Sequence, residues 1–231
     1  MQSETGQLVE FSDGSKNGKL AKITDYNSVY YFDLPSGHSC PMARSCKSKA
    51  DRYTGKVTDG KNMVFRCYAT SQEAIYKNLR NKRWRNFDTL RNIKDFDEMV
   101  AVLDNSFKQL PRSVDCVRLH TSGDFFNSMY FMAWIKVIKR YPEVLFYAYT
   151  KSLSYWVKNI DNIPSNMKLT ASYGGSEDSL IKDYDLANAR VFQTIEDIDN
   201  ANLPLDTNET NPINGVKEFA LLIHGTQPKK A

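Results

Sequence analysis

The sequence predicts an α/β fold with a mostly parallel sheet, arranged as a partial, incomplete TIM-like barrel of about six strands. From residue 114 onward, short apolar segments with strand character alternate with amphipathic helical segments. Such alternation is typical of parallel strands joined by right-handed crossovers. The strand-like segments are too few for the eight strands of a full barrel. No repeat or Pro/Gly-rich linker divides the 231 residues, so a single domain over 1–231 is expected, with a cysteine-bearing, metal-binding loop at 35–70.

The N-terminal part of the chain carries fewer regular signals than the rest. The expected elements there are a polar loop over 1–27, a strand over 27–34, a turn at 35–38, a polar loop to about 62 and a strand over 63–68. Thr70 followed by Glu73 is a capping-box pattern that predicts the start of a helix. Asp95 and Glu98 repeat the pattern for the clearest amphipathic helix, which we expect to end at Pro111.

The remaining elements follow the alternating pattern. The expected strands are 114–120, 144–150, 168–173, 190–194 and 219–224, and the expected helices are 128–140, 153–159 and a polar stretch before residue 190.

Composition places the chain among ordinary globular proteins, with 41 % hydrophobic and 25 % charged residues. No apolar run approaches the roughly 18 residues of a membrane span. The first residues are neither basic nor apolar, so no secretory signal is expected. We therefore expect a cytoplasmic protein without a membrane partner.

Three of the four cysteines are close together in the sequence. Five residues separate Cys40 from Cys46, and twenty separate Cys46 from Cys67. In a reducing compartment, clustered cysteines indicate a metal more often than a disulfide. Zinc sites usually contain closer pairs and four protein ligands, whereas three cysteines suit a [4Fe–4S] cluster with one open iron. Zinc remains the alternative metal, and three packed thiols are the alternative to a metal.

Cys116 lies in a predicted strand, where alternation places it on one face with Arg118 and His120. This polar face is either a polar interior beneath a site or an ordinary solvent-facing side. Cys116 is accordingly either a fourth metal ligand or a packed thiol.

Polar and small residues follow the ends of several predicted strands. The carboxyl ends of parallel strands meet at one edge of a sheet, where α/β folds place ligand sites. The candidate pocket residues are Ser122, Gly123, Asp124, Lys151, Tyr173, Gly174, Gly175, His224 and Gln227.

Positive charge is concentrated around the cysteines. Residues 40–94 hold 14 Lys and Arg against 4 Asp and Glu, although the net charge of the chain is only +4. Such a block indicates nucleic acid, an anionic cofactor or a negatively charged protein partner, unless it is only a solvated helix face.

Several longer runs point to a known family. They are Leu34-Pro-Ser-Gly-His-Ser-Cys-Pro41, Phe65-Arg-Cys-Tyr-Ala-Thr-Ser-Gln-Glu73, Ser122-Gly-Asp-Phe-Phe126, Phe146-Tyr-Ala-Tyr-Thr-Lys-Ser152, Thr170-Ala-Ser-Tyr-Gly-Gly175 and Ile223-His-Gly-Thr-Gln227. In these runs the chain resembles the "gene product eighty-eight" family of bacteriophage proteins, from about residue 16 to the end. The resemblance implies a phage origin and expression in the cytoplasm of an infected bacterium.

A looser similarity, at the level of architecture, is to radical-SAM enzymes. Those proteins hold a four-iron cluster on three cysteines at the mouth of a partial α/β barrel. The spacing here is C-x5-C-x20-C in place of their C-x3-C-x2-C, which puts SAM in doubt as a cofactor.

The leading hypothesis is a phage iron–sulfur protein whose cluster lies beside the strand-end pocket. If the protein is an enzyme, Asp124, Lys151 and His224 are the expected polar partners of a small-molecule substrate. The alternative is a protein stabilised by zinc or a cluster that binds nucleic acid, through residues 40–94, or a host protein without catalysis. A redox module is a third possibility.

Overall fold

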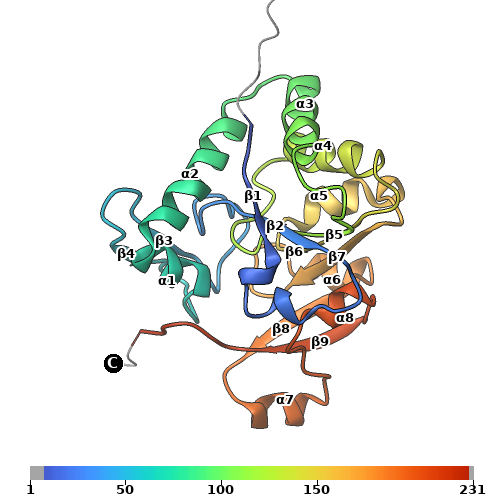
Figure 1. The fold of residues 1–231 in the computed structure, drawn as a ribbon. Helices are drawn as coiled ribbons and strands as arrows, with labels where there is room; N and C mark the ends of the chain where they lie inside the picture. The colour runs from blue at the N-terminus through green and yellow to red at the C-terminus, as the bar shows by residue number, and fades with distance from the viewer. Residues whose placement is uncertain (1–7, 229–231) are drawn as a thin grey trace, which may run out of the picture.

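The central element of the computed structural model, which describes residues 8–228, is a seven-stranded sheet (Figure 1). Its spatial order is β1 (Phe11–Asp13), β2 (Val29–Phe32), β5 (Cys116–Leu119), β6 (Leu145–Thr150), β7 (Met167–Ser172), β8 (Asn188–Phe192) and β9 (Glu218–Leu222). Only β1 is antiparallel to its neighbour, and the other six strands run parallel in chain order. The prediction of a mostly parallel sheet is confirmed.

One face of this sheet is covered by helices and holds the main core. Val117 and Leu119 of β5 and Phe146 of β6 point to this face, where they pack with Trp134. The covering helices are α3 (Phe96–Phe107), α4 (Ser128–Ile138) and α5 (Leu153–Lys158). Asp95 caps α3 by accepting a hydrogen bond from the Glu98 backbone N–H, as its sequence pattern predicts.

The opposite face is covered by the N-terminal segment and a short helix. Cys116 and Tyr147 pack there against Leu20 and Ile213. The covering elements are the 3₁₀ turns η1 (Gly14–Lys16) and η2 (Leu20–Lys22) and the helix α8 (Thr210–Ile213). Arg118 shares this face and is buried, so the face belongs to the interior and does not face solvent, and Cys116 is a packed thiol.

After β2 the chain leaves the sheet and returns to it only at α3. This segment, residues 33–95, is called the excursion here and contains the three clustered cysteines (Figure 1, left). Its elements are a hairpin of β3 (Ser48–Ala50) and β4 (Val57–Asp59), then α1 (Tyr68–Ile75) and α2 (Lys77–Arg91). The strand expected over 63–68 is absent from the described chain, because those residues form turns and the start of α1. The capping box expected at Thr70 is also wrong, because α1 begins after Cys67 and Glu73 is used elsewhere.

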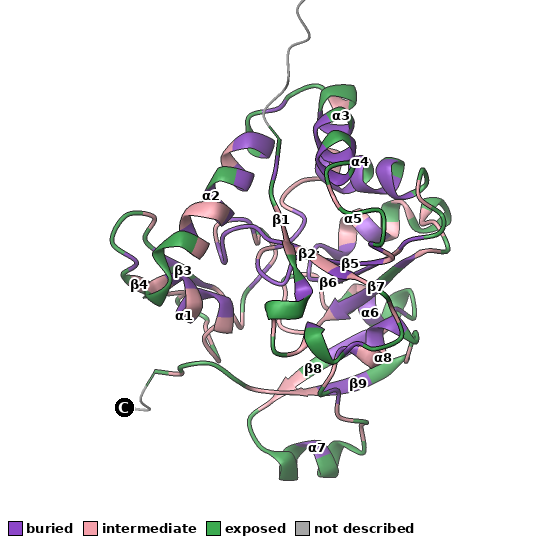
Figure 2. Ribbon diagram, in the orientation of Figure 1, coloured by how far each residue is buried: buried purple, intermediate pink, exposed green. Residues whose placement is uncertain are grey.

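The remaining elements lie at the periphery. They are η3 (Ile160–Asn162), α6 (Ser179–Asp183) and α7 (Ile195–Ala201). Figure 2 shows α7 to be largely exposed, whereas the central strands are buried. The loop expected over 1–27 contains β1, η1 and η2, and its first seven residues lie outside the described chain. Across residues 8–228, no helix has both the length and the apolar character to cross a membrane.

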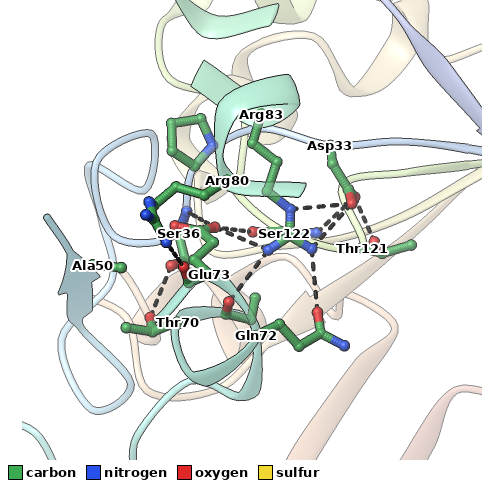
Figure 3. Close-up of polar contacts among 12 residues, drawn as sticks. Asp33, Ser36, Ala50, Thr70, Gln72, Glu73, Arg80, Arg83, Thr121 and Ser122 are labelled. Atoms are coloured by element: carbon green, nitrogen blue, oxygen red, sulfur yellow. Dashed lines mark hydrogen bonds and ion pairs between the residues drawn. The ribbon is translucent and has the colours of Figure 1, made fainter. Parts of the chain in front are cut away.

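A buried arginine ties the excursion to the sheet (Figure 3). Arg83 of α2 donates through Nη2 to Asp33 Oδ2 at 3.1 Å and through Nη1 to Glu73 Oε1 at 2.9 Å. Asp33 directly follows β2, and Glu73 belongs to α1. All three side chains are buried. One guanidinium therefore joins two helices of the excursion to the end of a sheet strand.

The same two carboxylates also hold backbone groups at the sheet edge. Asp33 Oδ1 accepts from the Ser122 N–H at 3.0 Å and from the Thr121 hydroxyl, both in the loop that follows β5. Glu73 Oε1 accepts from the Ser36 N–H at 2.9 Å and from the Ser122 hydroxyl at 3.2 Å. Burial raises the pKa of Glu73, and the Arg83 charge opposes that rise. The network fixes the start of the excursion against the loop after β5.

Replacing Arg83 with Met tests this network. Arg83→Met leaves the Asp33 and Glu73 carboxylates buried without their cation, which costs about 3–5 kcal/mol when one partner of a buried pair is removed. The free energy of unfolding, measured by urea denaturation, should fall by that amount.

Arg85→Met on the same helix is the matched control. Arg85 pairs with Glu10 at the surface, where both side chains are about half exposed. An exposed pair contributes about 0–1 kcal/mol. Equal losses in the two variants would contradict the structural role of the buried network.

Candidate ligand-binding site

A cavity of about 400 Å³ opens at the carboxyl ends of the parallel strands. One wall comes from the ends of β5, β6, β7, β8 and β9 and the loops that follow them. The other wall comes from the excursion, including Cys40, Cys46 and residues 65–68, and from residues 17–19 of the N-terminal segment. The cavity is therefore the space between the sheet edge and the excursion that Arg83 holds against it.

Five of the nine predicted pocket residues line this cavity. They are Ser122, Gly123, Asp124, Lys151 and His224. His224 lies at the exposed end of the cavity, where partial desolvation of its ring lowers its pKa to about 4, with smaller contributions from the charges of Lys19 and Arg118. His224 is therefore neutral at physiological pH, and its ring lies 4.4 Å from that of Tyr68, between centroids.

The other four predicted residues hold the rim of the cavity without lining it. Gly174 accepts through its carbonyl from the N–H groups of Arg44 and Ser45, at 3.0 and 2.9 Å. Ala43 forms a β-bridge with Gly175, and the carbonyl of Tyr173 accepts from Lys151 Nζ at 2.7 Å. The loop after β7 therefore docks the cysteine-bearing segment onto the sheet edge.

Gln227 makes a similar contact near the C-terminus, between the segment after β9 and Arg66. Its side chain accepts from the Arg66 N–H at 2.8 Å and donates to the Arg66 carbonyl at 3.1 Å. Figure 1 shows the chain after β9 running back toward α1, which brings this contact about. Gln227 therefore attaches the C-terminal segment to Arg66, which lines the cavity.

Gly123 permits a close approach between the loop after β5 and the start of the excursion. Its φ is +87°, and a Cβ there would lie 2.5 Å from Ser39 Oγ and 2.6 Å from Leu34 Cβ. Only glycine meets both the left-handed backbone and this contact.

The prediction of an iron–sulfur cluster on Cys40, Cys46 and Cys67 is wrong. The three cysteines line the same cavity, yet residues 8–228 contain no group of three or more His, Cys, Asp or Glu side chains arranged to hold a metal ion. The zinc or cluster of the alternative hypothesis is wrong for the same reason, whereas its nucleic-acid or host-protein partner stays a prediction. Cys116, the suggested fourth ligand, does not line this cavity, because its thiol is buried in the apolar cluster that also contains Leu20 and Ile213.

Burial also sets the protonation state of two of these thiols. Burial raises the pKa of Cys67 to about 12 and raises that of Cys40 well above its usual value. Positive charge near a thiol lowers its pKa, but two of the cations expected beside these cysteines do not act on them here. Arg66 donates through Nε to Asp59 Oδ1 at 3.0 Å, and Arg44 does not line this cavity. Cys40 and Cys67 are therefore neutral thiols in a cavity wall.

Asp124 organises the floor of the cavity. Its Oδ1 accepts from the Thr150 hydroxyl at 2.6 Å and the Phe125 N–H at 2.7 Å, and its Oδ2 accepts from the Lys151 N–H at 2.8 Å. Burial raises the pKa of Asp124 to about 6, and these hydrogen bonds oppose the rise. The carboxyl group therefore links the loops after β5 and β6 and titrates near neutral pH.

The cavity wall also contains a buried ion pair that the sequence did not predict. Arg118 Nη1 donates to Glu209 Oε1 at 3.1 Å, and the guanidinium lies 5.1 Å from the ring centroid of Tyr149. Within the described chain, Arg118 Nε, Glu209 Oε2 and the Tyr149 hydroxyl are buried and have no hydrogen-bond partner. Strand alternation located Arg118 on a polar face, but Glu209 lies in a polar segment with no local signal.

His120 departs from the face expected for it. Its φ of +63° breaks the strand alternation, since β5 ends at Leu119. The ring turns toward the helical face, where Nε2 and the Tyr130 hydroxyl are hydrogen-bonded at 2.9 Å. Burial lowers the pKa of His120 to about 3. The residue still borders the cavity, as a neutral group.

The raised pKa of Asp124 predicts a pH dependence of stability. In the folded chain this pKa is about 6, against 3.8 for a free side chain. The folded state therefore binds the Asp124 proton more tightly than the unfolded state does. The stabilisation that this proton contributes to folding is complete below about pH 4 and is lost as the pH rises through 6. Between pH 4 and 7 the wild type should lose up to about 3 kcal/mol relative to Asp124→Asn. Urea denaturation across this range measures it, and parallel profiles of the two proteins would contradict the raised pKa.

Comparison with known proteins finds a family for the chain and no structural relative. Similar proteins include the Gene 88 protein of Mycobacterium phage L5 and that of Mycobacterium phage D29, each 30 % identical over 142 residues. The match covers 58 % of this chain and 51 % of each relative, so the chain spans about half the length of the curated relatives it matches.

No solved structure matches, so the looser similarity to radical-SAM enzymes is not supported. A family model described as Gene product 88 matches residues 3–231, nearly the whole chain. The chain therefore belongs to the bacteriophage gene product 88 family.

Proposed function

We propose that the chain binds a small molecule in the cavity between the sheet edge and the excursion. The observation that carries this proposal is the set of unpartnered polar atoms on Arg118, Glu209 and Tyr149, all residues of the cavity wall. Leaving a buried polar group without a hydrogen bond costs about 1–3 kcal/mol. These atoms are covered in this structure, so a ligand that bonds them and recovers that cost must displace the side chains slightly from the positions seen here.

The unpartnered atoms suggest what the ligand presents. Arg118 Nε–H is a donor, the second oxygen of the Glu209 carboxylate is an acceptor, and the Tyr149 hydroxyl can be either. A group with an N–H beside a C=O, such as an amide, lactam or imide, complements such a set. Aliphatic side chains of Val191 and Leu221 line the same cavity and suit the apolar body of a small molecule.

Backbone strain at the cavity supports the same proposal. His120 and Glu209 both line the cavity and both adopt left-handed φ angles, +63° and +64°. Such angles cost energy in residues other than glycine and tend to cluster at functional sites. The location also agrees with the rule for parallel α/β sheets, which bind ligands at the carboxyl ends of their strands. The consecutive order of the six parallel strands supports a partial barrel around this site.

The proposal is tested with a set of small amides, lactams and imides, screened by saturation-transfer NMR. Uracil and 1,3-dimethyluracil form a matched pair, because methylation removes both N–H donors and keeps the ring. Uracil should bind at least about tenfold more tightly than its dimethyl analogue, equivalent to one lost hydrogen bond. A set with no member that binds would overturn the proposal.

The variant Leu221→Trp tests whether the ligand binds in this cavity, because Leu221 lines its wall. The indole would fill the cavity and should abolish binding of the compounds that the wild type binds. Ile195→Trp is the control, since Ile195 is exposed on α7 and does not line the cavity. Binding that survives Leu221→Trp unchanged would place the ligand elsewhere and contradict the proposal.

A further inference from the structure

Most of the arginines in the basic block of residues 40–94 are engaged within the protein. Arg83 belongs to the buried network, Arg66 pairs with Asp59, and Arg80 donates through Nε to the Arg52 carbonyl at 3.0 Å. Arg52 and Arg91 both pair with Asp88. The positive charge that this block offers to a partner therefore comes from a smaller set of side chains.

Three of these remaining cations surround a second cavity of about 400 Å³. They are Arg44, Lys47 and Lys61, joined at the wall by Asn62 and Ser176. Neither Asp nor Glu lines this cavity within the described chain, and the three cationic groups have no ion-pair partner there. Three cations without an anion repel one another, and an anion in the cavity would remove that repulsion.

The backbone that carries these cations is held in place from several sides. The N–H groups of Arg44 and Ser45 donate to the Gly174 carbonyl, and the Ser176 N–H donates to the Met42 carbonyl at 2.8 Å. The Lys47 N–H donates to the Arg44 carbonyl at 3.1 Å. The segment from residue 42 to 47 is thus clamped onto the loop after β7, so Arg44 and Lys47 are displayed from a fixed base.

Gly60 fixes the backbone next to Lys61 relative to the segment that carries Arg44 and Lys47. The Gly60 N–H donates to the Lys47 carbonyl at 2.7 Å, and Lys61 follows directly. A Cβ at residue 60 would lie 2.7 Å from that same carbonyl oxygen, so glycine is required for the contact. The backbone segments that carry the three cations are therefore held together before any ligand arrives, which lowers the entropic cost of binding.

We propose that this second cavity binds a phosphate group, with Arg44, Lys47 and Lys61 as its cationic contacts. Arg offers a planar fork of donors to phosphate oxygens, and each Lys offers a point charge with three donors. Asn62 and Ser176 supply neutral hydrogen-bond donors. The site is separate from the proposed small-molecule function, because the two cavities share only Ala43 in their walls.

The test measures binding of inorganic phosphate to the full chain by calorimetry at constant ionic strength. Wild type is compared with a variant that combines Arg44→Gln, Lys47→Gln and Lys61→Gln. Phosphate affinity should fall at least about tenfold, as expected for the loss of charge-assisted hydrogen bonds. The substituted side chains lie at the surface or are half-buried, and circular dichroism verifies that the variant is folded.

The control combines Lys77→Gln, Lys94→Gln and Lys136→Gln, three exposed lysines outside the cavity that give the same change in net charge. Its phosphate affinity should stay within about twofold of wild type, because distant surface charges are screened by salt. Absence of phosphate binding to wild type, or equal losses in the two variants, would overturn the proposal.

Two further probes distinguish the sources of the phosphate group. Ribose 5-phosphate that binds more tightly than phosphate, and loses this binding in the cavity variant, identifies a phosphorylated small molecule. A single-stranded oligothymidylate whose affinity falls steeply with salt and depends on the same residues identifies a nucleic-acid backbone. Either result supports the phosphate site, whereas binding of both probes unaffected by the cavity variant contradicts it.

Discussion

The guanidinium of Arg83 between the carboxylates of Asp33 and Glu73 is the contact on which the arrangement of this protein depends. A buried ion pair often adds little net stability compared with apolar residues of similar size. Its geometry is nevertheless demanding, because moving any partner leaves a buried charge uncompensated. The contact therefore specifies position, and it sets the excursion between β2 and β5 at one place on the sheet edge. Ser36 and Ser122 extend that constraint to the two backbone segments that meet there.

Both cavities follow from this placement. The first lies between the strand ends and the excursion, and the second lies where the excursion docks on the loop after β7. The buried arginine also changes how the basic block is understood, since the internally paired arginines are unavailable to a partner. The cations of the block that remain unpaired in the described chain include Arg44, Lys47 and Lys61, which surround the second cavity and are its proposed contacts to phosphate.

Sequence patterns predicted the parts of the fold that depend on local signals. The alternating strands and the Asp95 cap are of this kind, and the strand-end rule located Asp124, Lys151 and His224 at the cavity. The excursion was predicted poorly because its elements depend on distant partners. Glu73 matches a capping box, yet its carboxylate is bonded to Arg83. The cysteine spacing predicted a shared metal, whereas the three cysteines share only a cavity wall, and burial and the pairing of Arg66 cannot be deduced from spacing. Glu209 reaches Arg118 only through the tertiary fold, so no local pattern could have identified it.

Native-state hydrogen exchange of the wild-type chain tests most directly whether the buried network fixes the excursion against the sheet. The backbone N–H groups of Ser36 and Ser122 donate to network carboxylates, and the central strand β6 provides an internal reference. If the network holds the two walls together, these two amides should exchange about as slowly as those of β6, through global unfolding. Exchange of Ser36 and Ser122 that is orders of magnitude faster than that of β6 would show that the excursion opens independently, and would contradict preformed cavities.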